Sequence, residues 1–155
     1  SSAASDVYKR QERYSAANNH YVFEITETIE MDQIPAVQNV FKEFVKNEFR
    51  FAIDDFGTGY SNYGYMRDRT FDIVKVDRSF VTDIDKLKDN YLMVSFIIKM
   101  AHEMGLHVCI EGVETKEELS CVKKLGADYI QGYYYGKPVC LQDFEEQHLK
   151  RFVLG

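Results

Sequence analysis

The sequence has few cysteines, no long apolar run and no excess of positive charge, and each of these absences excludes a class of protein. Its three cysteines are an odd number and form no Cys-x-x-Cys pair, which argues against a disulfide framework and favours a reducing compartment. No apolar run approaches membrane-spanning length, and the N-terminus carries no signal-peptide pattern. We therefore expect a cytoplasmic chain, whose parent protein is free to be anchored to a membrane through other segments.

The charge balance is acidic: 25 Asp and Glu face 19 Lys and Arg, giving a formal net charge of −6. Proteins that bind nucleic-acid polymers usually carry a basic stripe, so no such polymer is expected as a partner. A small anionic ligand held through a cation stays compatible with this charge. The length of 155 residues and the apolar content of 45% are sufficient for one domain with a core of its own.

Strand and helix patterns alternate along the chain. We expect strands at 21–26, 50–55, 71–77, 107–113 and 129–136, and helices at 6–17, 32–48, 90–105, 116–126 and 141–152. This alternation predicts an α/β protein built of parallel βαβ units. Residues 1–19 are interpreted as a tag remnant ("SSAASD") and a leading helix, and residues 20–155 as part of one domain. The charged stretch at 83–90 is expected to be a solvated loop.

A polar residue stands near the end of each expected strand, where an apolar residue would be usual. These residues are Glu24, Asp54, Lys75, Glu111 and Gln131. In a (β/α)8 barrel the C-terminal ends of the strands carry the active site, whereas an open doubly wound sheet concentrates its site at one switch point. A complete barrel typically needs about 250 residues. The pattern therefore predicts a truncated (β/α)8 TIM-type barrel with about five βα units.

Two adjacent carboxylates, Asp54 and Asp55, follow an apolar run in "FAIDDFGTGYS". Ionised carboxylates side by side repel each other, and a metal ion would offset that repulsion. Together with Glu24 and Glu111 they supply the hard oxygen ligands that suit Mg²⁺ or Mn²⁺. A lysine among such carboxylates, here Lys75, suits a two-metal site that hydrolyses a phosphodiester, where the ammonium orients water or neutralises developing charge.

Five motifs follow one another along the chain: "FEITET", "DDFGTGYS", "FDIVKVDRSFV", "EGVET" and "QGYYYGKP". As a set they resemble the motifs of the EAL domain, the family of bacterial cyclic di-GMP phosphodiesterases. Their order and spacing agree with the family from about residue 20 to the C-terminus. The resemblance implies hydrolysis of cyclic di-GMP to linear pGpG in second-messenger signalling. It also implies a parent protein linked to sensory or diguanylate cyclase domains.

The resemblance implies a role for each matching position. Glu24, Asp54, Asp55 and Glu111 would bind the metals, with Asp54 bridging both of them and Glu111 acting either as a ligand or as the general base. Lys75 would contact the attacking water or the phosphate. Asp77 would lie near the metal site, and Glu114 and Gln131 would complete its polar wall. Glu27 would tether the loop of Gly57, Thr58 and Gly59, which resembles the family loop that links the site to dimerisation.

The chain also departs from the family pattern. The Glu-Ala-Leu tripeptide is absent, and neither Asn18 nor Asn19 stands where the family's upstream asparagine is expected. Two ligands of the first metal would then be missing, so we expect little or no activity from this chain alone. Smaller departures, none of which removes a charge, are Ile110, Asn62 and Gly136.

Two other functions stay open beside the catalytic one. The chain is also compatible with a degenerate domain that binds nucleotide or protein partners without turnover, and with hydrolysis of another phosphate ester. Open sheet edges near 21–26 and 129–136 predict a homodimer or a strand-exchanged oligomer. His102 and His107 match no strong zinc spacing and are interpreted as ordinary. Cys109 is expected to be a buried small apolar residue, and at least one tyrosine of 133–135 is expected in the core.

Overall fold

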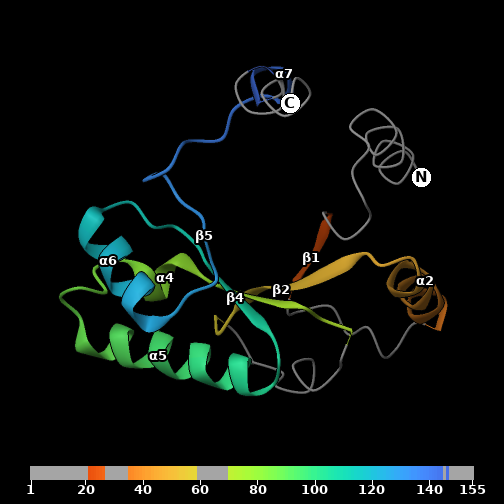
Figure 1. Ribbon diagram of the computed structural model, residues 1–155, viewed down its shortest axis with the longest axis horizontal. Helices are drawn as coiled ribbons and strands as arrows, with labels where there is room; N and C mark the ends of the chain where they lie inside the picture. The colour runs from red at the N-terminus through yellow and green to blue at the C-terminus, as the bar shows by residue number, and fades with distance from the viewer. Residues whose placement is uncertain (1–20, 27–34, 59–69, 145, 147–155) are drawn as a thin grey trace. The chain divides into compact units, whose positions relative to one another are not determined.

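The computed structural model describes residues 21–26, 35–58, 70–144 and 146 (Figure 1). Its elements are β1 (Val22–Thr26), α2 (Pro35–Lys46), β2 (Arg50–Phe56), β3 (Ile73–Val76), α4 (Arg78–Val81), α5 (Lys88–Glu103), β4 (His107–Ile110), α6 (Lys116–Leu125), β5 (Tyr129–Ile130) and α7 (Leu141–Phe144). The described residues up to Tyr135 form one compact unit, and those from Gly136 onward, including α7, belong to a second. No helix in the described ranges is long and apolar enough to cross a membrane.

The five strands form one parallel sheet in the order β1-β2-β3-β4-β5. Sequential order is the arrangement of consecutive βα units in a (β/α)8 barrel, whereas a doubly wound sheet reverses its strand order at a switch point. The prediction of an α/β protein with barrel-type units is therefore confirmed. Within the described part of the chain, β1 and β5 are the two edges of the sheet.

Side chains alternate between the two faces of the sheet, as the pleat requires. One face is the apolar core, which contains Ile53, Val74, Val76, Val108 and Ile110, each at most 2% exposed. The opposite face carries the residues between them in sequence, and it lines the pocket described below. Because both faces are covered at β3, the strand is buried along its whole length.

The helices cover the core through apolar faces. In α5, the buried residues Val94, Ile97, Ile98 and Ala101 recur at helical spacing, and the helix packs on β4, α4 and α6. Helix α2 packs on β1 and β2 through phenylalanines. The ring of Phe41 stacks on that of Phe51 with centroids 4.2 Å apart. Aromatic pairs of this kind add to the stabilisation from buried area alone.

Three expectations about the chain between the helices were wrong. The strand expected at 129–136 ends at Ile130, and the tyrosines that follow are all exposed, by 53%, 41% and 59%, so none of Tyr133, Tyr134 and Tyr135 lies in the core. The stretch after β3, for which no element was predicted, forms the short helix α4, because Asp77 caps it: its Oδ1 accepts the N–H of Ser79 at 2.9 Å. The charged stretch at 83–90 is not solvated throughout, since Ile84 is only 2% exposed.

Two aspartates hold neighbouring strands together at their N-terminal ends. Asp72 precedes β3 and accepts the Phe51 N–H through its side chain at 2.9 Å, while its own N–H donates to the Phe51 carbonyl at 2.9 Å. Asp128 precedes β5 and binds the backbone of Val108 in the same way, at 2.8 and 3.1 Å. Each aspartate thus binds both the N–H and the carbonyl of one residue in the adjacent strand, a pair of bonds called here a clasp.

Asp128 also contacts both histidines that the sequence left without a role. Its Oδ2 lies 2.8 Å from Nε2 of His102, and its Oδ1 lies 3.5 Å from Nδ1 of His107. Burial alone would raise the pKa of Asp128, but the hydrogen bonds from His102, Val108 N–H and His107 outweigh it and lower the pKa. The folded chain therefore favours the ionised form of this carboxyl.

Replacing Asp128 by asparagine is expected to lower the free energy of unfolding by about 1 kcal/mol at pH 5, where the carboxylate is ionised. A carboxyl whose pKa is lowered by folding contributes stability above its unfolded pKa and loses it as the pH falls through the folded value. In urea titrations the gap between the two proteins should therefore begin to narrow as the pH falls below about 4, the unfolded value, and continue to narrow through the lower folded value. Asp85→Asn, at an exposed carboxylate, serves as the control. A gap that persists unchanged at pH 3 would contradict the prediction.

Candidate metal centre

One buried lysine lies at the centre of three carboxylates. Nζ of Lys75 lies 2.8 Å from Oε2 of Glu24, 2.8 Å from Oδ1 of Asp54 and 2.9 Å from Oε1 of Glu111. The lysine side chain is 6% exposed, whereas those of Glu24, Asp54 and Glu111 are 50%, 21% and 18% exposed. The ammonium is thus covered from solvent, and the carboxylates form the side of the cluster that is open to water.

The sheet explains why these residues meet. Glu24 lies on β1, Asp54 on β2 and Lys75 on β3, and Glu111 directly follows β4. In a parallel sheet the C-terminal ends of all strands lie at the same end of the sheet, so polar residues placed there come close together. Alternation turns Lys75 away from Val74 and Val76, which are 0% exposed in the core. The sequence prediction of convergence holds for these four residues.

The charges of the cluster shift the pKa of its members. Burial would lower the pKa of Lys75, but its hydrogen bonds to Asp54, Glu24 and Glu111 outweigh burial and raise the pKa, so the lysine stays charged. Burial raises the pKa of Glu111, and Lys75 only partly opposes this. Burial and the nearby charge of Glu111 also raise the pKa of Cys109 to about 11, so this thiol stays protonated at neutral pH.

The donor set fits a divalent cation. Asp54, Asp55 and Glu111 each offer a carboxylate oxygen, and these oxygens lie within 4.8 Å of one another. With Glu24, the group holds four carboxylates and the single ammonium of Lys75, which leaves a formal excess of three negative charges. Hard oxygen donors of this kind suit Mg²⁺ and Mn²⁺. The residues therefore fit the predicted metal chemistry.

A pocket of about 330 Å³ lies along the same face of the sheet. Its lining residues are Val22, Glu24, Arg50, Ala52, Ile73, Lys75, Cys109, Tyr129 and Gln131. Three of the residues predicted for the site thus share one pocket. Cys109, which is only partly buried, faces this pocket and does not join the apolar core, contrary to the sequence expectation.

The loop after β2 is prepared at Asp55, the second-last residue of the strand, which adopts a left-handed backbone conformation with φ of 56°. This conformation turns the chain out of the strand. Thr58 closes the turn by donating its hydroxyl and its N–H to the Asp55 carbonyl at 2.9 and 3.3 Å. A Cβ on Gly57 would lie 3.0 Å from the ring of Phe80 on α4. Two of the three predicted loop residues therefore define the turn, and Gly59 lies outside the described residues.

The remaining predicted residues do not all lie at the Lys75 cluster. Asp77 caps α4, and the hydrogen bonds from Ser79 and Arg78 lower its pKa although burial would raise it. Glu114 pairs with Nη2 of Arg78 at 2.9 Å. Gln131 lines the pocket and its backbone pairs with Ile110 and Val113. Glu27 lies outside the described residues.

Sequence reasoning did not find Arg78 as part of the site. Its aliphatic side chain fills the space where a Cβ on Gly112 would stand, directly after Glu111. Gly112 has φ of 69°, a left-handed conformation that side chains disfavour. The "DRS" following a strand was a signal for a capped helix, but nothing in the sequence indicated that the arginine would reach Glu114.

Gly112→Ala is expected to destabilise the chain by about 2 kcal/mol. The left-handed backbone costs an alanine about 1–2 kcal/mol, and the Arg78 side chain must also move. Thermal unfolding measures the stability loss, and calorimetric titration with Mn²⁺ should show weaker binding because Glu111 is the preceding residue. Gly105→Ala is the control, since it has φ of 79° but nothing within 4 Å of the added Cβ. Equal Mn²⁺ affinity in the two variants would refute the link to Glu111.

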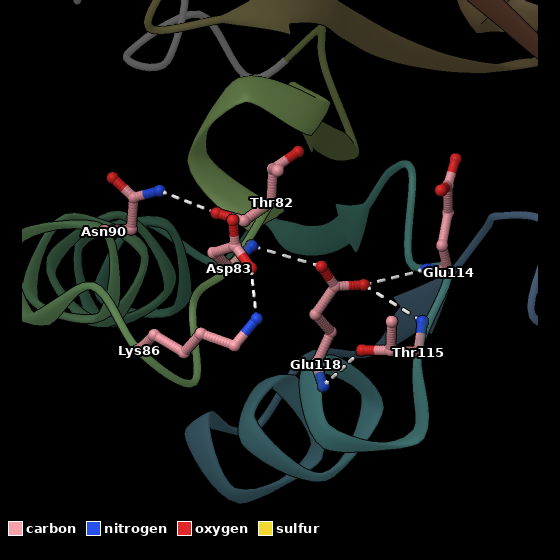
Figure 2. Close-up of polar contacts among 7 residues, drawn as sticks. All are labelled: Thr82, Asp83, Lys86, Asn90, Glu114, Thr115 and Glu118. Atoms are coloured by element: carbon pink, nitrogen blue, oxygen red, sulfur yellow. Dashed lines mark hydrogen bonds and ion pairs between the residues drawn. The ribbon is translucent and has the colours of Figure 1, made fainter.

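A second group that sequence reasoning missed centres on Glu118 of α6. Figure 2 shows its carboxylate between the turn at Asp83 and the backbone of Glu114 and Thr115. Glu118 is 6% exposed and, with Lys75, one of the two buried charged residues in the described part of the chain. The sequence offered only the Thr-x-x-Glu pattern of a capping box, which does not reveal contacts beyond its own helix.

Comparison with known proteins agrees with this geometry. The EAL domain family model matches residues 1–138. Cyclic di-GMP phosphodiesterase PdeB of Shewanella oneidensis is 33% identical over 147 residues, which are 95% of this chain and 17% of PdeB.

Solved structures give the same result. The EAL domain of Mycobacterium smegmatis DcpA matches with a TM-score of 0.80 and 27% identity over 94% of this chain and 65% of that one. The manganese and cyclic di-GMP complex of Klebsiella pneumoniae BlrP1 matches with a TM-score of 0.74 and 28% identity. The match covers 88% of this chain and 35% of BlrP1. The chain thus spans a minor part of PdeB and of BlrP1. With the family model covering more than half of its residues, this chain belongs to the EAL domain family.

Proposed function

We propose that the chain is part of a metal-dependent phosphodiesterase that hydrolyses cyclic di-GMP to linear pGpG. The observation that carries this proposal is the cluster of Lys75 with Glu24, Asp54 and Glu111, beside Asp55, in a member of the EAL family. A related protein, PdeB, is named as a cyclic di-GMP phosphodiesterase, and BlrP1 binds manganese and cyclic di-GMP together. These names support the substrate class and a divalent metal for this chain.

The residues would divide the work as follows. Asp54, Asp55, Glu111 and Glu24 would hold Mg²⁺ or Mn²⁺ ions, which when bound polarise the phosphate and lower the pKa of water. Lys75 would stay charged and stabilise negative charge developing on the phosphate oxygens. One P–O bond forms to the oxygen of water and one P–O bond to a ribose oxygen breaks.

Glu111 is placed either to bind a metal or to accept the proton of the attacking water. Its raised pKa, caused by burial, brings it closer to the range that suits a proton acceptor. Asp77, Glu114 and Gln131 would shape the wall of the site, and Glu27 would act on the loop of Gly57, Thr58 and Gly59. These roles are part of the proposal.

The test is hydrolysis of cyclic di-GMP with Mn²⁺ or Mg²⁺, run on this chain and on any longer natural protein that carries it. We expect turnover in a protein with a complete barrel and little from this chain alone, because the described residues supply five of the eight strands. If neither protein is active but both still bind the nucleotide, the enzyme hypothesis would be wrong and the chain would belong to a degenerate domain that binds without turnover.

We also propose that the chain self-associates as a homodimer or strand-exchanged oligomer. Within the described part of the chain, β1 and β5 are the edges of the sheet, and sheet edges are where another chain can add by strand pairing. Sedimentation equilibrium measures this directly, and a monomer at all concentrations would refute it. The cytoplasmic location, the link to sensory or diguanylate cyclase domains and the assignment of 20–155 to one domain stay predictions.

A further inference from the structure

We propose that Glu118 is a positioning residue for the metal centre: its carboxylate holds the segment that carries Glu111 against the turn between α4 and α5. The inference rests on the proposed function, because it concerns the same site. It adds a residue that contacts none of the predicted metal ligands through its side chain and acts through the backbone that follows Glu111.

The Glu118 carboxylate accepts three backbone hydrogen bonds from two different segments (Figure 2). Its Oε2 accepts the N–H groups of Glu114 and Thr115 at 2.9 and 3.0 Å, and its Oε1 accepts the N–H of Asp83 at 3.1 Å. A capping box needs only the bond to the N-cap residue, here Thr115, whose hydroxyl in turn accepts the Glu118 N–H at 3.1 Å. The bonds to Glu114 and Asp83 exceed what the cap requires.

These bonds hold a short segment that starts at Glu111. The N–H of Glu111 donates to the Val76 carbonyl at 3.1 Å, which is the last bond between this segment and β3. Gly112 follows with its left-handed turn, and the Glu114 N–H is already bound to Glu118. Only Gly112 and Val113 separate the two fixed points, and Val113 is itself buried and bonded through its backbone to Gln131 and Tyr134. Glu118 is therefore one of several groups that hold this segment, and loss of its bonds would loosen the position of Glu111. A misplacement of about 1 Å can cost about 10²-fold in rate.

The turn at Asp83, which donates to the Glu118 carboxylate, is itself held by further contacts. Asp83 has φ of 56°, a left-handed conformation that exposes its N–H toward Glu118, and its carboxylate pairs with Lys86 at 2.5 Å. Asn90 of α5 donates to the Thr82 carbonyl at 3.1 Å (Figure 2). The turn is thus attached to α5. Glu118 connects this turn, and through it α5, to the segment after β4.

A role in the metal centre and a role in helix capping alone make different predictions. If Glu118 only caps α6, its removal lowers the unfolding temperature and leaves the metal affinity of the folded chain unchanged. If it positions Glu111, the metal affinity falls in protein that is still folded. Substitutions next to metal ligands that disturb their orientation typically cost about 10–100-fold in metal affinity.

The experiment is calorimetric titration with Mn²⁺ of the unchanged chain, Glu118→Ala and Glu118→Gln, well below each Tm. The matched controls are Glu117→Ala and Glu117→Gln, which remove the same charge from the same turn of α6 at an exposed side chain. We expect about 10-fold or greater loss for Glu118→Ala and no change for either control. Glu118→Gln should lie between them, because its amide oxygen still accepts from Glu114 and Thr115 while its NH₂ group opposes the Asp83 N–H.

Each result decides between the explanations. Equal Mn²⁺ affinity in Glu118→Ala and Glu117→Ala, with a lower Tm only for the first, would reduce Glu118 to a structural cap and overturn the inference. If Glu118→Ala does not fold, the same test is made by comparing the Mn²⁺ affinities of Glu118→Gln and Glu117→Gln: a lower affinity for Glu118→Gln supports the inference, and equal affinities overturn it. Absence of Mn²⁺ binding in the unchanged chain would instead overturn the proposed metal site, and the inference with it.

Discussion

Asp54→Asn is expected to abolish Mn²⁺ binding at the candidate centre and to lower phosphodiesterase turnover by at least about 10²–10³-fold in any active protein that carries this chain. Like Glu111, Asp54 belongs to both parts of the site: it pairs with Nζ of Lys75 at 2.8 Å and offers an oxygen to the cluster with Asp55 and Glu111. Asparagine keeps the shape of the side chain but removes its charge, so the loss reports charge and not packing.

Calorimetric titration with Mn²⁺ and a hydrolysis assay measure the two effects. Asp72→Asn is the matched control, because Asp72 is an aspartate at the opposite end of the strands that accepts a backbone N–H of β2. It should lose stability and keep its Mn²⁺ affinity. Retention of full Mn²⁺ affinity in Asp54→Asn would remove this residue from the metal site.

Lys75→Met is expected to lower the free energy of unfolding by about 3 kcal/mol in metal-free solution, and added Mn²⁺ should recover most of this loss. Methionine fills the space of the lysine stem but leaves Glu24, Asp54 and Glu111 without their cation, and removal of one partner of a buried pair is costly. A divalent ion that binds only the folded chain then supplies positive charge and shifts the equilibrium toward folding.

The pH dependence of this difference follows from the pKa of Lys75, which the folded chain raises. A raised lysine pKa gives stability that is fully present below the unfolded value and is lost only as the pH rises through the folded value. The difference between the two proteins should therefore be constant from pH 7 to pH 9. Urea denaturation with and without Mn²⁺ provides the measurement, with the exposed Lys86→Met as control. A loss that Mn²⁺ does not reduce would show that the lysine acts through packing alone.

The parts of the site that were predictable from sequence are those that lie on strands. Asp54 and Lys75 interrupt apolar runs, and an interruption at the end of a parallel strand indicates a side chain turned toward the site. Strand alternation and the shared direction of the strands then place Glu24 and Glu111 beside them. These are short-range rules that need only the sequence around each residue.

The parts that were not predictable depend on contacts between segments far apart in the chain. Arg78 and Glu114 are 36 positions apart in sequence (114 − 78), and Glu118 reaches the Asp83 N–H across 35 positions. An exposed-looking Glu in the first turn of a helix has the same local pattern whether it caps the helix or clasps a distant loop. The prediction that a tyrosine after β5 lies in the core was wrong for a related reason. It assumed that strand alternation continues beyond Ile130, where the strand ends.

The clasps of Asp72 and Asp128 have a consequence for the far end of the sheet. A parallel strand that slips by one residue turns every side chain to the opposite face. Such an error at β3 would send the Lys75 ammonium into the apolar layer under the helices and bring Val74 or Val76 to the carboxylates. Each aspartate binds both the N–H and the carbonyl of one defined residue, Phe51 or Val108, and a shifted strand would lose this pair of bonds. The fidelity of the charged centre is thus secured at the end of the strands where no chemistry takes place.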